Sequence, residues 1–189
     1  MSHTSPARTT TASTLLVTTA LIATLLVLSG CKSKTAATPE NFTTTLNAYF
    51  LEHPDCLFPT PPRFPYETSN PAMSKQLDTL IPAQLLTKSE EMSIHASRYT
   101  PTTTGARFAP RFCYGHRTIT AIDSFTPPAQ ANGFPETQVA YHYSMEDVPV
   151  WAKSAAVQAA FPDMATATSG HASGKATLAG TLAGWQVPD

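Results

Sequence analysis

The stretch 138-QVAYHYSM-145 alternates between two kinds of side chain more regularly than any other part of the chain. From position 139 its odd positions hold the larger apolar and aromatic side chains, namely Val139, Tyr141, Tyr143 and Met145. The even positions between them hold Ala140, His142 and Ser144. Because successive side chains of a strand point to opposite faces, this alternation predicts a strand that is buried on one face only. Half-buried strands of this kind are typical of antiparallel sheets.

Further strands are predicted on both sides of this stretch. Residues 116–125 precede it and residues 175–187 follow it, and each is predicted to form one strand. Residues 92–99 and 106–114 are predicted to form a hairpin, because a threonine-rich turn separates them. Residues 126–136 are expected to be a long connection, since they are rich in proline and contain an Asn-Gly pair.

Three helices are predicted to accompany the strands. Residues 39–52 follow Thr38 as an N-cap, have a proline in the first turn, and carry apolar side chains at helical spacing. A second helix is predicted over 71–81, with Asn70 as its N-cap and Pro71 in its first turn. A third helix over 148–160 is predicted after Asp147, which can cap it.

The order of these elements predicts the fold class. Two helices, about three strands, a helix and a final strand favour an antiparallel sheet with helices packed on one side. No internal repeat and no second domain boundary is visible in the sequence. We therefore expect a single α+β domain over residues 39–189.

The start of the chain has the layout of an export signal. A polar start with Arg8 as its only Lys or Arg is followed by the uncharged, mostly apolar residues 14–28 and by 28-LSGC-31. The apolar run of about 15 residues is shorter than the roughly 20 that a membrane-spanning helix needs. The sequence LSGC resembles the lipobox of bacterial lipoproteins. The alternative is an ordinary signal peptide, or a signal anchor in which Cys31 stands by chance.

The lipobox resemblance implies a processed and acylated amino terminus. Residues 1–30 would be removed as the signal peptide, and Cys31 would carry a diacylglycerol and an added acyl chain such as palmitate. Residues 31–38 would then be a short tether to the domain, and two or more acyl chains anchor a protein stably. Because Lys32 rather than an aspartate follows the cysteine, the resemblance favours the outer membrane, facing the periplasm, over the inner membrane.

Two cysteines remain once Cys31 is assigned to lipid. Cys56 and Cys113 would lie in the oxidising periplasm, so we expect them to form one disulfide. The alternative is that one of them is a reactive or catalytic thiol.

The composition limits the classes of partner and cofactor. Twelve Lys and Arg residues face thirteen Asp and Glu residues without any basic run, which gives no electrostatic footprint for nucleic acid. No metal-binding histidine spacing, Gly-x-Ser-x-Gly elbow or glycine-rich phosphate loop occurs. We therefore expect no nucleic acid, cofactor or metal, and we assign no catalytic residue. The partners that remain are the membrane, through the lipid, and an envelope protein.

One internal stretch has a second resemblance. The sequence 73-MSKQLDTLIPAQLLTKSEEMSIHASRYTPTTTGARF-108 resembles the helix, "LL" turn and β-wing of winged-helix domains, over about a fifth of the chain. No basic recognition helix accompanies it. Outside the cytoplasm the resemblance implies a module that packs or binds protein rather than DNA, and fold analogy alone carries no function.

Histidines and acids supply one possible site. His95, His116 and His142 fall on predicted strands and could gather into an acid–base or metal site if those strands are neighbours. Asp123, Glu146 and Asp147 could pair for general acid–base work. The alternative is that each histidine faces solvent alone and that each aspartate belongs to a turn or cap.

Aromatic side chains supply another possible site. Tyr141, Tyr143, Trp151 and Trp185 could line a ligand groove, and His116 and His142 could face the same ligand. Such aromatic residues more often belong to the core, and an exposed Trp151 or Trp185 would favour the groove.

Three functions follow as hypotheses. The first is a lipid-anchored envelope lipoprotein that acts as a non-catalytic interaction or structural module and presents a flat apolar patch. The second is a small-ligand binding module with a concave aromatic groove. The third is an envelope enzyme, which should bring His116 or His142 within hydrogen-bond reach of Asp123 or another acid.

Overall fold

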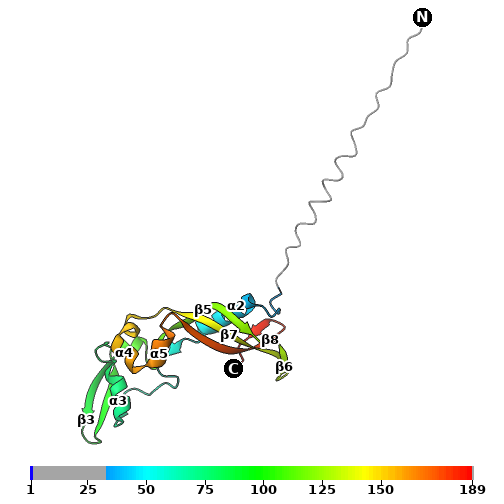
Figure 1. The fold of residues 1–189 in the computed structure, drawn as a ribbon. Helices are drawn as coiled ribbons and strands as arrows, with labels where there is room; N and C mark the ends of the chain where they lie inside the picture. Colours follow the sequence, from blue (N-terminus) through cyan, green and yellow to red (C-terminus); the bar gives the residue numbers. More distant parts are fainter. Residues whose placement is uncertain (2–32, 189) are drawn as a thin grey trace. The chain divides into compact units, whose positions relative to one another are not determined.

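The computed structural model describes Met1 and residues 33–188, and its folded unit begins at Lys34. Over the described residues this unit is a single α+β domain with four α-helices and two antiparallel sheets (Figure 1). The predicted fold class is therefore confirmed. The predicted signal peptide and the lipidation residue Cys31 lie outside the described residues.

The larger sheet has six strands. Its order is β1-β5-β7-β8-β9, with β6 also pairing with β7, and every pairing is antiparallel. The strands are β1 (Asp55–Cys56), β5 (Cys113–Phe125), β6 (Ala129–Ala131), β7 (Phe134–Glu146), β8 (Ala172–Thr181) and β9 (Gly184–Gln186).

Strand β7 is the central strand of this sheet, and it is buried on one face only, as its sequence predicts. Val139, Tyr141 and Tyr143 are buried, whereas His142 between them is exposed. Pairing with β5 on one side and β8 on the other engages the backbone hydrogen-bonding groups of β7 along both edges. The buried side chains of β7 therefore face a core, and the exposed ones face away from it.

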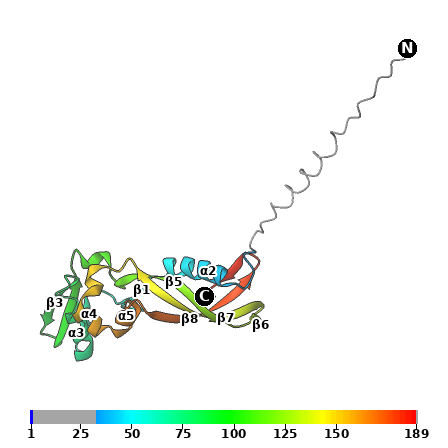
Figure 2. The ribbon, with the colours of Figure 1, turned by 45° about the horizontal axis from the view of Figure 1, so that its top comes forward.

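Helix α2 (Pro39–Glu52) covers the face of the sheet that carries the buried tyrosines (Figure 2). It forms as predicted, with the Thr38 hydroxyl accepting a hydrogen bond from the backbone N–H of Asn41. Phe42, Leu46 and Phe50 point from it into the core. Each such buried side chain contributes about 1.5–3 kcal/mol through the removal of apolar surface from water.

The smaller sheet corrects the predicted hairpin. Its order is β2 (Tyr66–Thr68), β4 (Ala96–Pro101) and β3 (Leu86–Glu91), so the partner of β4 is residues 86–91 rather than 106–114. Four of the six side chains of β3 are exposed, because it is an edge strand, and such a strand shows no alternation in sequence. Residues 73–108 thus contain the hairpin of β3 and β4.

Close packing of Gly105 explains why the predicted second strand does not form. The 3₁₀ helix η2 (Gly105–Arg107) lies where the strand over 106–114 was expected. A side chain on Gly105 would collide with the backbone carbonyl of Leu85, so this tight turn needs glycine. Helix α3 (Pro71–Asp78) begins after the predicted cap Asn70 but ends at Asp78 rather than at residue 81. Asp78 accepts a 2.7 Å hydrogen bond from the Tyr99 hydroxyl of β4.

The third predicted helix is broken into shorter pieces. The chain forms η3 (Val150–Lys153), α4 (Ala155–Ala160) and α5 (Pro162–Ala167), and Ser154 is extended between the first two. Asp147 has a φ of 57° and lies two residues before the cap position of η3, so it does not cap a helix. The pair 161-FP-162 begins α5 instead of ending a helix, because proline is well tolerated in a first turn.

The end of the chain forms a hairpin and not one strand. β8 and β9 flank a tight turn at 182–183, where Leu182 is fully exposed instead of packing beside Leu178. Gly184 has a φ of 125°, a left-handed conformation that favours glycine. The expected connection over 126–136 likewise holds β6 and the first residues of β7.

Two interactions fasten the proline-rich segment 54–71 to the sheet. Cys56 and Cys113 form the predicted disulfide, with an S–S distance of 2.08 Å, between β1 and β5. Beside it, Arg117 donates two hydrogen bonds to the Asp55 carboxylate, at 2.7 and 2.8 Å. The disulfide closes a separation of 57 residues and contributes on the order of 4 kcal/mol in the chain-entropy model.

We predict that Asp55→Ala lowers the free energy of unfolding by about 2–3 kcal/mol, because it leaves the largely buried Arg117 cation unpaired. Glu67→Ala is the matched control, since Glu67 also binds an arginine, Arg98, but both side chains are well exposed. That control should change stability by less than about 1 kcal/mol. Urea denaturation monitored by circular dichroism measures both values, and equal losses would contradict the prediction.

Candidate functional site

The described residues hold no group of three or more His, Cys, Asp or Glu side chains placed to bind a metal ion. Over the same residues, no helix has both the length and the apolar character needed to cross a membrane. The candidate sites are a histidine–carboxylate pair and the grooves that Trp151 and Trp185 line.

The pair is His142 on β7 and Asp123 on β5. Nδ1 of His142 lies 2.8 Å from Oδ1 of Asp123, and a register irregularity in β5 between Ile122 and Ser124 accompanies the approach. Ser173 on β8 is the register partner of His142, so the three polar residues follow one line across neighbouring strands. This line lies on the face opposite the buried tyrosines.

The His142–Asp123 contact is the one that the enzyme hypothesis requires. A carboxylate on one ring nitrogen fixes the orientation of an imidazole and favours a proton on the other nitrogen. The two side chains are nevertheless 51% and 40% exposed. Water therefore reaches the pair, and among the described residues no side-chain hydrogen bond joins Ser173 to His142.

The other histidines do not join this pair. His116 lies 3.5 Å from Asp147 and is the register partner of Glu146, four residues along β7 from His142. At about 3.3 Å per strand residue, that separation is about 13 Å. His95 is not on a strand as predicted, but in the turn between β3 and β4, with a φ of 48°. His95, His116 and His142 therefore do not gather into one site, and the alternative of separate histidines holds.

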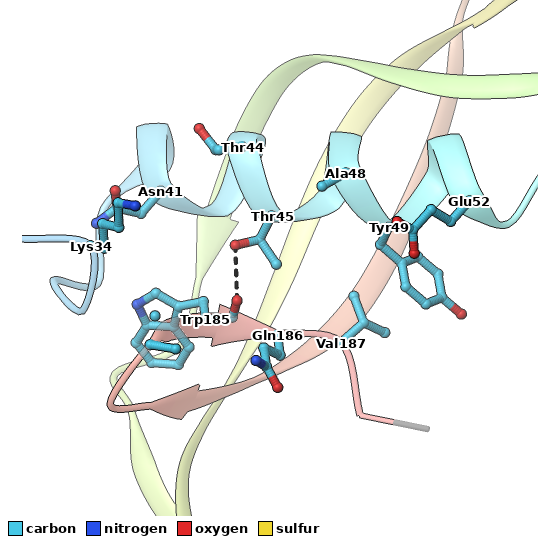
Figure 3. A pocket seen from close by; sticks show the side chains of 12 residues that line it. Lys34, Asn41, Thr44, Thr45, Ala48, Tyr49, Glu52, Trp185, Gln186 and Val187 are labelled. Carbon is cyan, nitrogen blue, oxygen red and sulfur yellow. Dashed lines mark hydrogen bonds between the residues drawn. The ribbon is translucent and has the colours of Figure 1, made fainter.

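Trp185, on β9 of the C-terminal hairpin, lies opposite α2 and lines a groove of about 620 Å³ (Figure 3). Its indole N–H donates to the Ala36 carbonyl at 3.1 Å, and its own carbonyl accepts from Thr45 at 3.1 Å. Its ring meets Phe42 edge to face, with 5.1 Å between centroids. Trp185 is only 7% exposed, so it joins three segments of the chain as part of the core.

Trp151 lines a different groove, of about 500 Å³, together with Leu85 and Phe108. Its side chain is 8% exposed and meets Phe108 edge to face, while Val150 beside it is 86% exposed. The indole Nε1 of Trp151 is buried and has no acceptor among the described residues. A buried donor without a partner costs about 1–3 kcal/mol.

The four aromatic residues do not form a single groove. Tyr141 and Tyr143 pack under α2, where Arg117 lies over the Tyr143 ring at 4.7 Å, and the two tryptophans line separate grooves. Both tryptophans are buried. The exposed tryptophan that would favour a ligand groove is therefore not found at either position.

Ionisable groups around Arg117 are strongly perturbed. Burial alone lowers the pKa of Arg117, but the hydrogen bonds and negative charge of Asp55 outweigh it and raise that pKa above its ordinary value. Burial raises the pKa of Tyr114 to about 12, with a further contribution from Asp55. Burial also raises the pKa of Tyr141 and of Tyr143. Arg117 therefore stays protonated across physiological pH, and Tyr114, Tyr141 and Tyr143 stay neutral.

Sequence reasoning missed the Arg117–Asp55 pair. Asp55 lies in the proline-rich segment and Arg117 on a strand 62 residues later, so no local spacing connects them. The signal in the sequence is their distance from the two cysteines of the disulfide. Asp55 directly precedes Cys56, and Arg117 follows Cys113 by four residues.

We predict that Trp185→Phe lowers the free energy of unfolding by about 1 kcal/mol more than Trp151→Phe does. The two substitutions remove the same atoms from equally buried positions, but only Trp185 loses a hydrogen bond. Urea denaturation of the two variants gives the difference. Equal losses, or a larger loss for Trp151→Phe, would contradict the role given to the Ala36 contact.

Comparison with known proteins adds no family to this picture. No family model, no curated protein and no solved structure matches the chain.

Proposed function

We propose that the chain is a lipid-anchored lipoprotein of the bacterial cell envelope, whose folded domain acts in the periplasm as a non-catalytic interaction or structural module. The observation that carries the proposal is the use of the three cysteines. Cys56 and Cys113 bind each other, which leaves Cys31, within LSGC, as the cysteine available for lipid. A disulfide in the domain also fits an oxidising compartment.

The start of the folded domain supports attachment close to a membrane. Lys34 already belongs to the folded unit, and Ala37 packs against the core. Only residues 32 and 33 thus separate Cys31 from the start of the folded unit. A tether this short keeps the domain at the membrane surface, where it would meet membrane-bound partners.

The experiment that tests the anchor is intact mass spectrometry of the protein extracted from membranes, with and without reductant and alkylating agent. We expect a chain that begins at Cys31, carries acyl chains and exposes two thiols only after reduction. In Cys31→Ser the acyl mass should be lost and the protein should leave the membrane fraction, while the disulfide is retained. A protein that keeps residues 1–30 or lacks lipid would overturn the proposal.

The enzyme hypothesis is a second candidate, favoured by the His142–Asp123 contact. An imidazole oriented by a carboxylate could act as a general base for the hydroxyl of Ser173 on the neighbouring strand. Under the non-catalytic proposal we expect wild type and His142→Ala to hydrolyse p-nitrophenyl acetate equally slowly, with His116→Ala as the matched control. A fall of about 100-fold in His142→Ala alone would favour the enzyme.

A further inference from the structure

The N-terminal segment of the folded domain is held firmly in place. The Ala36 carbonyl accepts hydrogen bonds from the Asn41 side chain at 2.8 Å and from the Trp185 indole at 3.1 Å. Only three peptide units separate Lys34 from Cys31, and a fully extended chain covers about 3.3–3.6 Å per residue. Lys34 can therefore lie no more than about 11 Å from the lipidation site.

The two hairpin turns beside this segment expose apolar side chains. Leu182, in the turn between β8 and β9, is fully exposed at 103%, and Phe134, at the start of β7, is 48% exposed. Both line a groove of about 520 Å³ whose other walls include Thr35 and Ala37. The exposed apolar surface is thus continuous with the segment that leads to Cys31.

The charges around this surface suit a lipid interface. None of the residues that line the groove carries a charge, so the groove meets apolar surroundings without the cost of burying an ion. In the sequence, Lys32 and Lys34 fall between Cys31 and Thr35, the first residue that lines the groove. Lysine side chains at a membrane surface are attracted to anionic headgroups.

From these observations we infer that the domain rests on the membrane through this end, with Leu182 and Phe134 inserted at the boundary between headgroups and acyl chains. The occupant of the groove is the phospholipid surface that also holds the acylated Cys31. The inference rests on the proposed lipid anchor and adds an orientation to it. In this orientation Asp123 on β5, His142 on β7 and Ser173 on β8 do not take part in the lipid contact.

The test places the photoreactive amino acid benzoylphenylalanine at position 182 of the full, lipidated protein. The protein is reconstituted in vesicles of phosphatidylethanolamine and phosphatidylglycerol, irradiated, and analysed for phospholipid adducts by mass spectrometry. The matched control has the same replacement at Ile94, which is 54% exposed in the β3–β4 turn, in the smaller sheet. We expect at least about fivefold more lipid adduct at position 182 than at position 94.

The possible outcomes separate this inference from the anchor. Acylated protein with equal adduct yields at 182 and 94, or with position 182 crosslinked to a second copy of the chain, overturns the orientation and leaves the anchor standing. Protein without acyl mass overturns both. Circular dichroism identifies a variant that fails to fold. If the replacement at position 182 disrupts folding, benzoylphenylalanine at position 134 tests the same orientation independently.

Discussion

The Arg117 cation is the point on which several elements of this domain depend. Its guanidinium binds the Asp55 carboxylate of β1 and lies over the rings of Phe50 in α2 and Tyr143 in β7, at 5.0 and 4.7 Å. A partly buried cation is stable only where a carboxylate and aromatic faces replace the water it loses. One side chain therefore contacts the proline-rich segment, the helix and the central strand, and the adjacent disulfide is a second, covalent link between the segment and the sheet.

That arrangement separates the two faces of the large sheet. Helix α2 and the aromatic residues occupy one face, and the opposite face carries His142, Asp123 and Ser173 across three strands. Because the core needs only one face of the antiparallel sheet, the other is free to hold polar side chains. The N-terminal segment and the C-terminal hairpin meet at the Trp185–Ala36 hydrogen bond, and Thr35 and Ala37 of that segment line the same groove as the exposed Leu182.

The sequence predicted those elements whose signals are local. The alternation of 138–145, the caps Thr38 and Asn70, and the pairing of two leftover cysteines all correspond to what the structure shows. It failed where the signal is not local. Strand β3 is polar because it lies at an edge, and the helix predicted over 148–160 breaks at Ser154. His95 was expected on a strand, but the true register places it in a turn.

The amino-acid sequence by itself determined the fold class, the buried face of β7, the course of α2 and the motif that predicts a lipid on Cys31, because each depends on the spacing of residues along one segment. Only the tertiary structure decided which side chains meet across segments. The contacts Arg117–Asp55, His142–Asp123 and Trp185–Ala36 join residues 62, 19 and 149 positions apart. Such contacts depend on strand order, register and bulges, which arise from the packing of the whole core and leave no periodic trace in the sequence.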